Sequence, residues 1–259
     1  MNLTDDETLK FQRGTPILLD DICAIYSATI GEIIDEGYST FQQYLGILTT
    51  SKPIAQEGGD PEVKKLLDGL SDFQYLLLMS AVDTQVNELL KRAFMFFTHE
   101  TVIFSLDPAQ IVIGVVEEKH ILNEEKFYEL RSILRHMYFL DAGEEDIIIN
   151  ADDSDAVKRL KRQMLENREK VRRAKARQAA REKSDLKFSD LIGSVTINNC
   201  GLNMENVWNI TYYAFHDQLK RMGWRDQFNI NNRAALAGVK VKKNQLQHWM
   251  RSIADSKKS

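Results

Sequence analysis

The stretch from Asn203 to Ile253 constrains the fold of this chain more than any other segment. It holds all three tryptophans, which are Trp208, Trp224 and Trp249. A polar residue at Asn203, followed by apolar residues close to helical spacing, predicts a long helix from Asn203 to Met222. We expect Gly223 to end this helix because glycine is unfavourable in helix interiors and common just after them.

A second, short helix is predicted beyond Gly223. The chain first makes an aromatic turn through Trp224 and Phe228, and the helix then covers Asn231 to Ala237 and ends at Gly238. The segment from Arg233 to Trp249 also has the small residues and Gly-Val turn of a helix-turn-helix, whose second helix enters a DNA major groove. The sequence alone leaves both a protein-binding and a DNA-binding interpretation open at this point.

The first 150 residues predict a mostly helical body with a small β element. Residues 1–13 lack apolar periodicity and are expected to form a loose terminus. An apolar run at 16–19 indicates a strand, and two β-branched runs on either side of Asp107-Pro108 indicate a hairpin. Apolar residues at helical spacing predict helices at 22–36, at 38–50, within 62–97 and, after a cap at Asn123, at 124–137; residues 52–61 are expected to form a loop.

A strongly basic segment lies in an otherwise acidic chain. Lys158 to Lys183 holds twelve basic residues against three acidic ones, although the whole chain carries a net charge of -4. The residues from Ala156 to Lys183 are good helix formers with few apolar side chains, which favours an exposed linker helix over a core helix. Solvation is the preferred interpretation; contact with nucleic acid or an acidic protein is the alternative, with Arg172, Arg173 and Arg177 as candidate contact residues.

The predicted fold class is therefore mainly α with a small β element. We divide the chain into a helical N-terminal domain (1–150) with a short β hairpin, a charged linker helix (151–187), and a C-terminal aromatic helical subdomain (188–259). The oligomeric state does not follow from these patterns.

No catalytic motif stands out. The five histidines show neither the His-Glu-x-x-His pattern nor a Cys/His pair at zinc spacing, and no glycine-rich phosphate loop is present. We expect no enzyme activity, metal or cofactor. Cys23 and Cys200 are expected to be reduced, because an acidic N-terminus indicates no export signal and no apolar run approaches a bilayer span.

The aromatic C-terminal end is the best candidate for binding another protein. Large rigid aromatic residues beside basic ones are typical of binding hot spots, although packing in the core of a small helical subdomain accounts for most of them. The residues proposed for contact are Trp224, Phe228, His248, Trp249 and Met250. Trp249 is the leading candidate because little chain follows to cover it, whereas Trp208 is expected to be buried.

The chain resembles tail assembly chaperones of long-tailed phages and prophages of Gram-positive bacteria. The residues that carry this resemblance are Asn123 to Tyr138, then Trp208, Tyr212, Gln218 and Arg221, then Ala237-Gly238, and finally His248-Trp249-Met250 and Ile253. The order of helical body, short strand region, charged linker and aromatic end is also similar across most of the chain.

The resemblance implies a non-catalytic protein of the host cytoplasm. Such a protein binds the tape-measure protein and keeps it soluble until tail tube proteins polymerise around it. Two alternatives remain: a structural protein of the virion tail, such as a completion or baseplate component, and a helix-turn-helix regulator. The acidic body argues against DNA binding, and no feature indicates a membrane.

Overall fold

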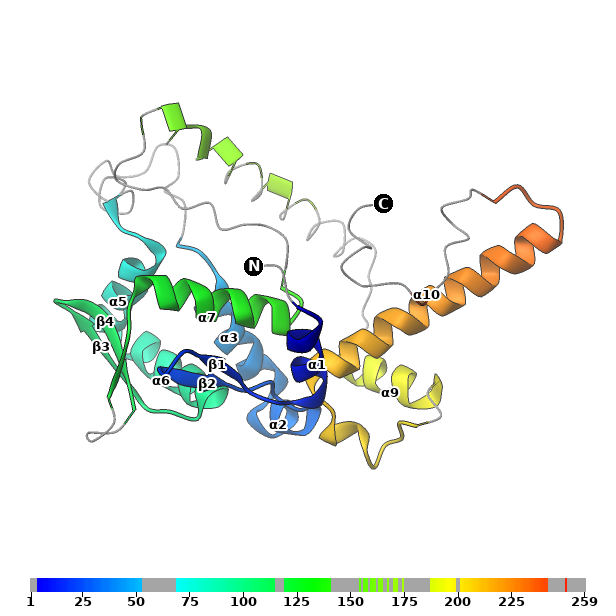
Figure 1. Cartoon of the computed structure of the whole chain (residues 1–259), viewed down its shortest axis with the longest axis horizontal. Helices are drawn as coiled ribbons and strands as arrows, with labels where there is room; N and C mark the ends of the chain where they lie inside the picture. Colours follow the sequence, from blue (N-terminus) through cyan, green and yellow to red (C-terminus); the bar gives the residue numbers. More distant parts are fainter. Residues whose placement is uncertain are drawn as a thin grey trace. The chain divides into compact units, whose positions relative to one another are not determined.

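The computed structural model describes residues 4–52, 69–114, 119–140, 187–198, 201–241 and 250, together with Ser154 and part of 156–174. Its elements in chain order are α1 (Asp5–Arg13), β1 (Ile17–Leu19), β2 (Cys23–Ile25), α2 (Ile30–Glu36), α3 (Tyr38–Thr49), α5 (Asp72–Val82), α6 (Thr84–Thr98), β3 (Val102–Leu106), β4 (Ala109–Ile113), β5 (His120–Leu122), α7 (Glu124–Met137), α9 (Phe188–Asn198), the 3₁₀ helix η1 (Val207–Asn209) and α10 (Tyr212–Leu236). The described part is mainly helical with two small antiparallel sheets, as the sequence predicts (Figure 1).

The chain forms two compact units, each assembled from separated segments. Unit 1 comprises Met1–Asn2, Pro16–Tyr26 and Glu36–Asp185, and unit 2 comprises Leu3–Thr15, Ser27–Asp35 and Leu186–Ser259. The chain therefore passes repeatedly between the units within its first 36 residues. Residues 3–15 and 27–35, which were predicted to belong to the N-terminal domain, group in the structure with the C-terminal segment.

Aromatic side chains form much of the core of unit 1. Phe41 of α3 lies against Phe97 of α6, with ring centroids 6.3 Å apart, and against Tyr138 after α7 at 5.3 Å. Phe73 of α5 packs on Phe127 of α7 at 5.2 Å. All five rings are buried. Aromatic rings bury a large apolar area each, so these contacts hold four helices around one core.

The larger sheet has the strand order β3-β4-β5 and lies against α5 and α6. Phe104 pairs with Ile111, which in turn pairs with Leu122. The ring of Phe104 also contacts Phe94 of α6 at 6.1 Å. The predicted hairpin is confirmed, but the third strand was missed because three residues, His120–Leu122, give no readable alternation.

The predicted helix at 22–36 begins later than expected. Cys23–Ile25 instead pairs antiparallel with Ile17–Leu19 as strand β2. Asp20 adopts a positive φ of 47° and allows the tight turn between the two strands. The prediction was wrong here because the apolar residues Ile22, Ile25 and Tyr26 suit a hairpin as well as a helix.

Capping boxes mark two helix starts that the periodicity did not locate. Thr4 Oγ1 accepts a hydrogen bond from the Glu7 N–H (3.2 Å), and the Glu7 carboxylate accepts one from the Thr4 N–H (2.8 Å). Residues 5–13 are therefore a helix with Phe11 buried, and the expected loose terminus was wrong. Thr29 and Glu32 form the same reciprocal pair at the start of α2.

From Tyr212 to Leu236 the chain forms one continuous helix, α10, rather than the predicted long helix, aromatic turn and short helix. Helix α10 runs for 25 residues, and the Thr211 side chain accepts a hydrogen bond from the Ala214 N–H at its start. Gly223 lies inside this helix, so the predicted break and aromatic turn were wrong. A glycine costs a helix only about 1 kcal/mol, which the flanking helix-forming residues offset. Asn203 instead caps a turn before η1.

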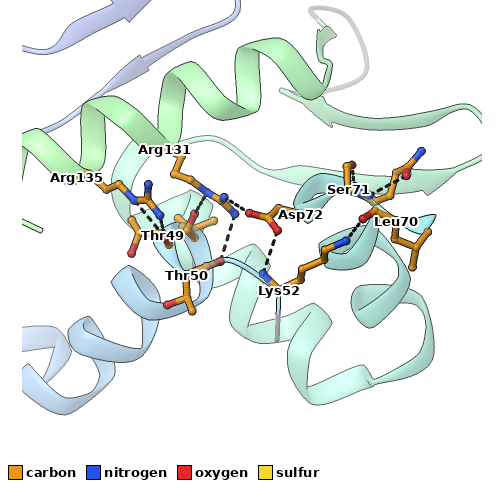
Figure 2. A network of polar contacts seen from close by, with 10 residues as sticks. Thr49, Thr50, Lys52, Leu70, Ser71, Asp72, Arg131 and Arg135 are labelled. Atoms are coloured by element: carbon orange, nitrogen blue, oxygen red, sulfur yellow. Dashed lines mark hydrogen bonds and ion pairs between the residues drawn. The ribbon is translucent and has the colours of Figure 1, made fainter. Parts of the chain in front are cut away.

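A buried arginine joins three helices of unit 1 (Figure 2). Arg131 of α7 is 1% exposed and forms an ion pair of 2.7 Å with Asp72, the first residue of α5. It also donates hydrogen bonds to the Leu48 and Thr50 carbonyls at the end of α3, at 3.2 and 3.3 Å. The last carbonyls of a helix lack partners within that helix, so the guanidinium caps α3 and complements its negative end.

Neighbouring residues extend this network. Arg135, one turn along α7, donates two hydrogen bonds to the Thr49 carbonyl at 3.2 and 2.6 Å. The Lys52 N–H donates to Asp72 (3.1 Å), while the Lys52 ammonium donates to the Leu70 carbonyl. Each residue that Figure 2 labels at the meeting point of α3, α5 and α7 thus takes part in a hydrogen bond or an ion pair.

We predict that replacing Asp72 with Asn lowers the free energy of unfolding by about 3–5 kcal/mol, because the buried Arg131 charge loses its counter-ion. Glu88→Gln is the matched control, since it removes an exposed ion pair with Lys91 and should cost less than about 1 kcal/mol. Urea denaturation followed by circular dichroism measures both values. Equal costs for the two variants would contradict the role assigned to Arg131.

Candidate protein-binding site

The first turns of α10 form the core of unit 2 with α1 and α9. Tyr213 lies 5.4 Å from Phe11 of α1, measured between ring centroids, and Phe215 lies 5.7 Å from Phe188 of α9. Thr211 donates a hydrogen bond of 2.9 Å to the Phe11 carbonyl. The N-terminal end of α10 is therefore fixed by side chains from both ends of the sequence.

Backbone pairing fixes the same end of α10 to the segment before α2. The Tyr212 N–H donates to the Ala28 carbonyl, and the Ile30 N–H donates to the Ile210 carbonyl, each at 2.9 Å. At Gly31, an added Cβ would lie 3.0 Å from the Trp208 carbonyl oxygen. A side chain at this position would push the two segments apart, so glycine is required for the close approach.

Trp208 itself is not buried as expected. It lies in η1, before α10, and its side chain is only half-buried. Its indole N–H donates a 2.6 Å hydrogen bond to the Met204 carbonyl. The expectation assumed one helix from Asn203 onward, and the short 3₁₀ turn places this ring differently.

A half-buried histidine lies beside the anchored end of α10. The His216 ring is 4.2 Å from the Tyr212 ring and 5.3 Å from the Phe215 ring. Burial lowers the pKa of His216 to about 4, and the positive charge of Lys220 contributes. His216 is therefore neutral at physiological pH and serves packing in unit 2.

The second half of α10 differs from the first because large apolar residues there remain accessible. Ile230 is 62% exposed and Leu236 is 82% exposed. Trp224 and Phe228, two of the predicted contact residues, lie four positions apart and are half-buried on one face of the helix. Ile230 lies on another face, so the apolar surface of this half extends around the helix.

The remaining predicted contact residues are only partly covered by the structure. Met250 is exposed. His248 and Trp249 lie outside the described residues, as do Arg172, Arg173 and Arg177 of the basic segment. Ile230 and Leu236 were not predicted as contact residues, because the break expected at Gly223 separated them from the long helix.

Reactive groups in the described part of the chain are held in packing environments. Cys23 is a free thiol, and burial raises its pKa to about 12, with the Glu100 carboxylate contributing. Within the residues described, no cluster of three His, Cys, Asp or Glu side chains could hold a metal ion. Nor does any described helix have the length and apolar character needed to cross a membrane.

Comparison with known proteins links the C-terminal part of the chain to phages. Residues 178–254, less than half of the 259-residue chain, match the family model of the YomV second domain, which is phage-derived. The matched range includes α9, η1 and α10 but not α1 or α2. A search of the curated proteins found no match, and a search of the solved structures found none either.

We predict that His216 makes stability depend on pH. Its pKa of about 4 in the folded chain lies below the ordinary histidine value of 6.5, so the unfolded chain binds the proton more tightly. The neutral His216 side chain therefore contributes about 3 kcal/mol to the free energy of unfolding. This contribution is fully present above pH 6.5 and is lost as pH falls towards 4. Urea denaturation of the protein and of His216→Gln should show a stability difference that shifts by this amount between pH 7 and pH 4. A constant difference would contradict the prediction.

Proposed function

We propose that the chain is a non-catalytic phage protein that binds other proteins, and specifically a tail assembly chaperone whose client is the tape-measure protein. The observation that carries this proposal is the accessible apolar surface on the second half of α10, at the end of a helix whose first half is firmly anchored. The match to a phage-derived domain over 178–254 includes this helix and supports the phage context.

An anchored helix with an accessible apolar end suits a chaperone for a helical client. Helical clients present apolar stripes that must be covered until assembly, and a second helix with exposed aliphatic and aromatic side chains can cover them. Because unit 2 fixes α10 at residues 211–217, its far end is presented without refolding of the helix. This preorganisation reduces the entropy lost on binding.

The proposed site includes the predicted residues Trp224, Phe228, His248, Trp249 and Met250, with Ile230 and Leu236 added by the structure. The protein acts in the host cytoplasm and needs no cofactor. Tail tube proteins replace it on the client as the tail polymerises. A chaperone is absent from finished particles, whereas a structural tail protein copurifies with them.

We predict that Ile230→Ser combined with Leu236→Ser weakens client binding but leaves folding intact, because both side chains are already mostly exposed. Coexpression with a tape-measure protein measures the effect as the soluble fraction of that client. The intact chain should keep it soluble, and the double variant should do so at least severalfold less well.

Ile197→Ser is the matched control, because Ile197 of α9 belongs to the same unit and is equally exposed. It should leave client solubility unchanged. If all three proteins solubilise the client equally, the second half of α10 is not the binding surface. If the chain is instead found in purified virions, the structural alternative replaces the chaperone.

A further inference from the structure

The basic segment carries an apolar stripe with a seven-residue period. Four of its apolar residues are more than one-third exposed: Val157 (39%), Leu160 (57%), Met164 (44%) and Val171 (54%). Their spacings of three, four and seven place them at the first (a) and fourth (d) positions of consecutive heptads. Ala174 occupies the next d position and is also exposed. This is the pattern of one strand of a coiled coil.

The local structure agrees with this pattern. All described residues from Ala156 to Ala174 are helical. Ser154 precedes them, and its hydroxyl accepts a hydrogen bond of 3.4 Å from the Val157 N–H, as a helix cap does. The stripe thus lies along one side of a helix, and its apolar side chains are open to solvent.

The positions that flank the stripe are almost all basic. In a coiled coil the e and g positions lie beside the apolar seam and meet those of the partner helix. Lys161 and Lys170 occupy such positions in the described part, with Gln163 as the exception. The sequence places Arg168, Lys175 and Arg177 at further e and g positions.

This charge pattern determines which partner fits. Two copies of the helix would bring basic flanks together in either orientation, since g faces e in a parallel pair while e faces e and g faces g in an antiparallel one. Like charges at these positions oppose pairing. A helix with acidic flanks would instead form favourable pairs along both sides of the seam.

We propose that the segment carrying Val157, Leu160, Met164 and Val171, whose described residues are helical, forms a two-stranded coiled coil with an amphipathic helix of another protein that carries Glu or Asp at its flanking positions. Asn167 lies at a d position and is exposed. A polar residue in the seam fixes the register by favouring a polar residue opposite it. This inference concerns a different surface from that of α10 and does not depend on the proposed function.

A nucleic acid is the competing partner for a basic helix. Phosphate binding requires positive charge but no apolar stripe, and it is indifferent to substitutions at a and d positions. The regular exposure of Val157, Leu160, Met164 and Val171 is explained by a helical partner and not by a phosphate backbone. The acidic helix is therefore favoured.

The test uses the full-length chain and a fluorescein-labelled synthetic peptide of four heptads, with Leu at a and d, Glu at e and g, and Asn opposite Asn167. Such a peptide repels itself, so it should gain helicity in circular dichroism only when the chain is added. Fluorescence anisotropy should show binding that is at least about tenfold tighter than for the same peptide with Lys at e and g.

Variants of the chain separate the stripe from the charge. Leu160→Ser combined with Met164→Ser should weaken peptide binding by roughly tenfold or more without changing the melting temperature. Val82→Ser removes an apolar residue exposed elsewhere, on α5, and should have no effect.

Three results would overturn the proposal. The first is peptide binding that persists in the double serine variant, which would show simple charge attraction. The second is tighter binding to a labelled DNA duplex of mixed sequence than to the peptide in the same buffer. The third is a dimer of the free chain in sedimentation velocity that the double serine variant converts to monomer.

Discussion

The buried Arg131 guanidinium is the interaction on which the organisation of unit 1 depends. Arg131 belongs to α7, and its guanidinium binds the end of α3 and the start of α5. It also lies over the ring of Phe127, 5.1 Å from the ring centroid. A charge removed from water is costly unless it is paired and hydrogen-bonded, so its partners Asp72, Leu48 and Thr50 must be in place together. The aromatic core around Phe41 and Phe73 can tolerate varied packing, whereas this network specifies how the helix ends meet.

Unit 2 depends on a different constraint, which is the pairing of segments from opposite ends of the sequence. Thr211 caps α10 and also binds the Phe11 carbonyl, while Ala28 and Ile30 pair with the backbone on either side of it. Removal of the segment after Lys187 would therefore leave α1 and α2 without the partners that bury them. This anchoring also links the fold to the proposed function, because it holds one end of a long helix in place and leaves apolar side chains at the far end accessible.

The helices and strands were predicted correctly where one strong sequence pattern had no competing interpretation. The Asn123 cap followed by a regular apolar stripe located α7 correctly, and the two β-branched runs located the β3–β4 hairpin.

Errors arose where periodicity was used without capping chemistry. The pairs Thr4–Glu7 and Thr29–Glu32 are readable signals that would have placed α1 and α2. The pairing of Ala28 and Ile30 with Tyr212 and Ile210 has no local signal, because it depends on contacts between residues far apart in the chain. Trp224 and Phe228 were identified as candidate contact residues, but Ile230 and Leu236 became visible only once α10 proved continuous.

The basic segment shows why the number of apolar residues is a weaker guide to how a helix packs than the spacing at which they recur. Val157, Leu160, Met164 and Val171 are too few for a helix packed into a globular core, which needs a wide apolar face. A two-stranded coiled coil uses only the narrow seam formed by the a and d positions, so the same four residues are sufficient in number and correctly aligned. Because the flanking charge opposes self-association, the apolar seam stays accessible in the free protein. The basic residues that make the segment look merely solvated thus have a second effect: they select an acidic helix as the one that can cover it.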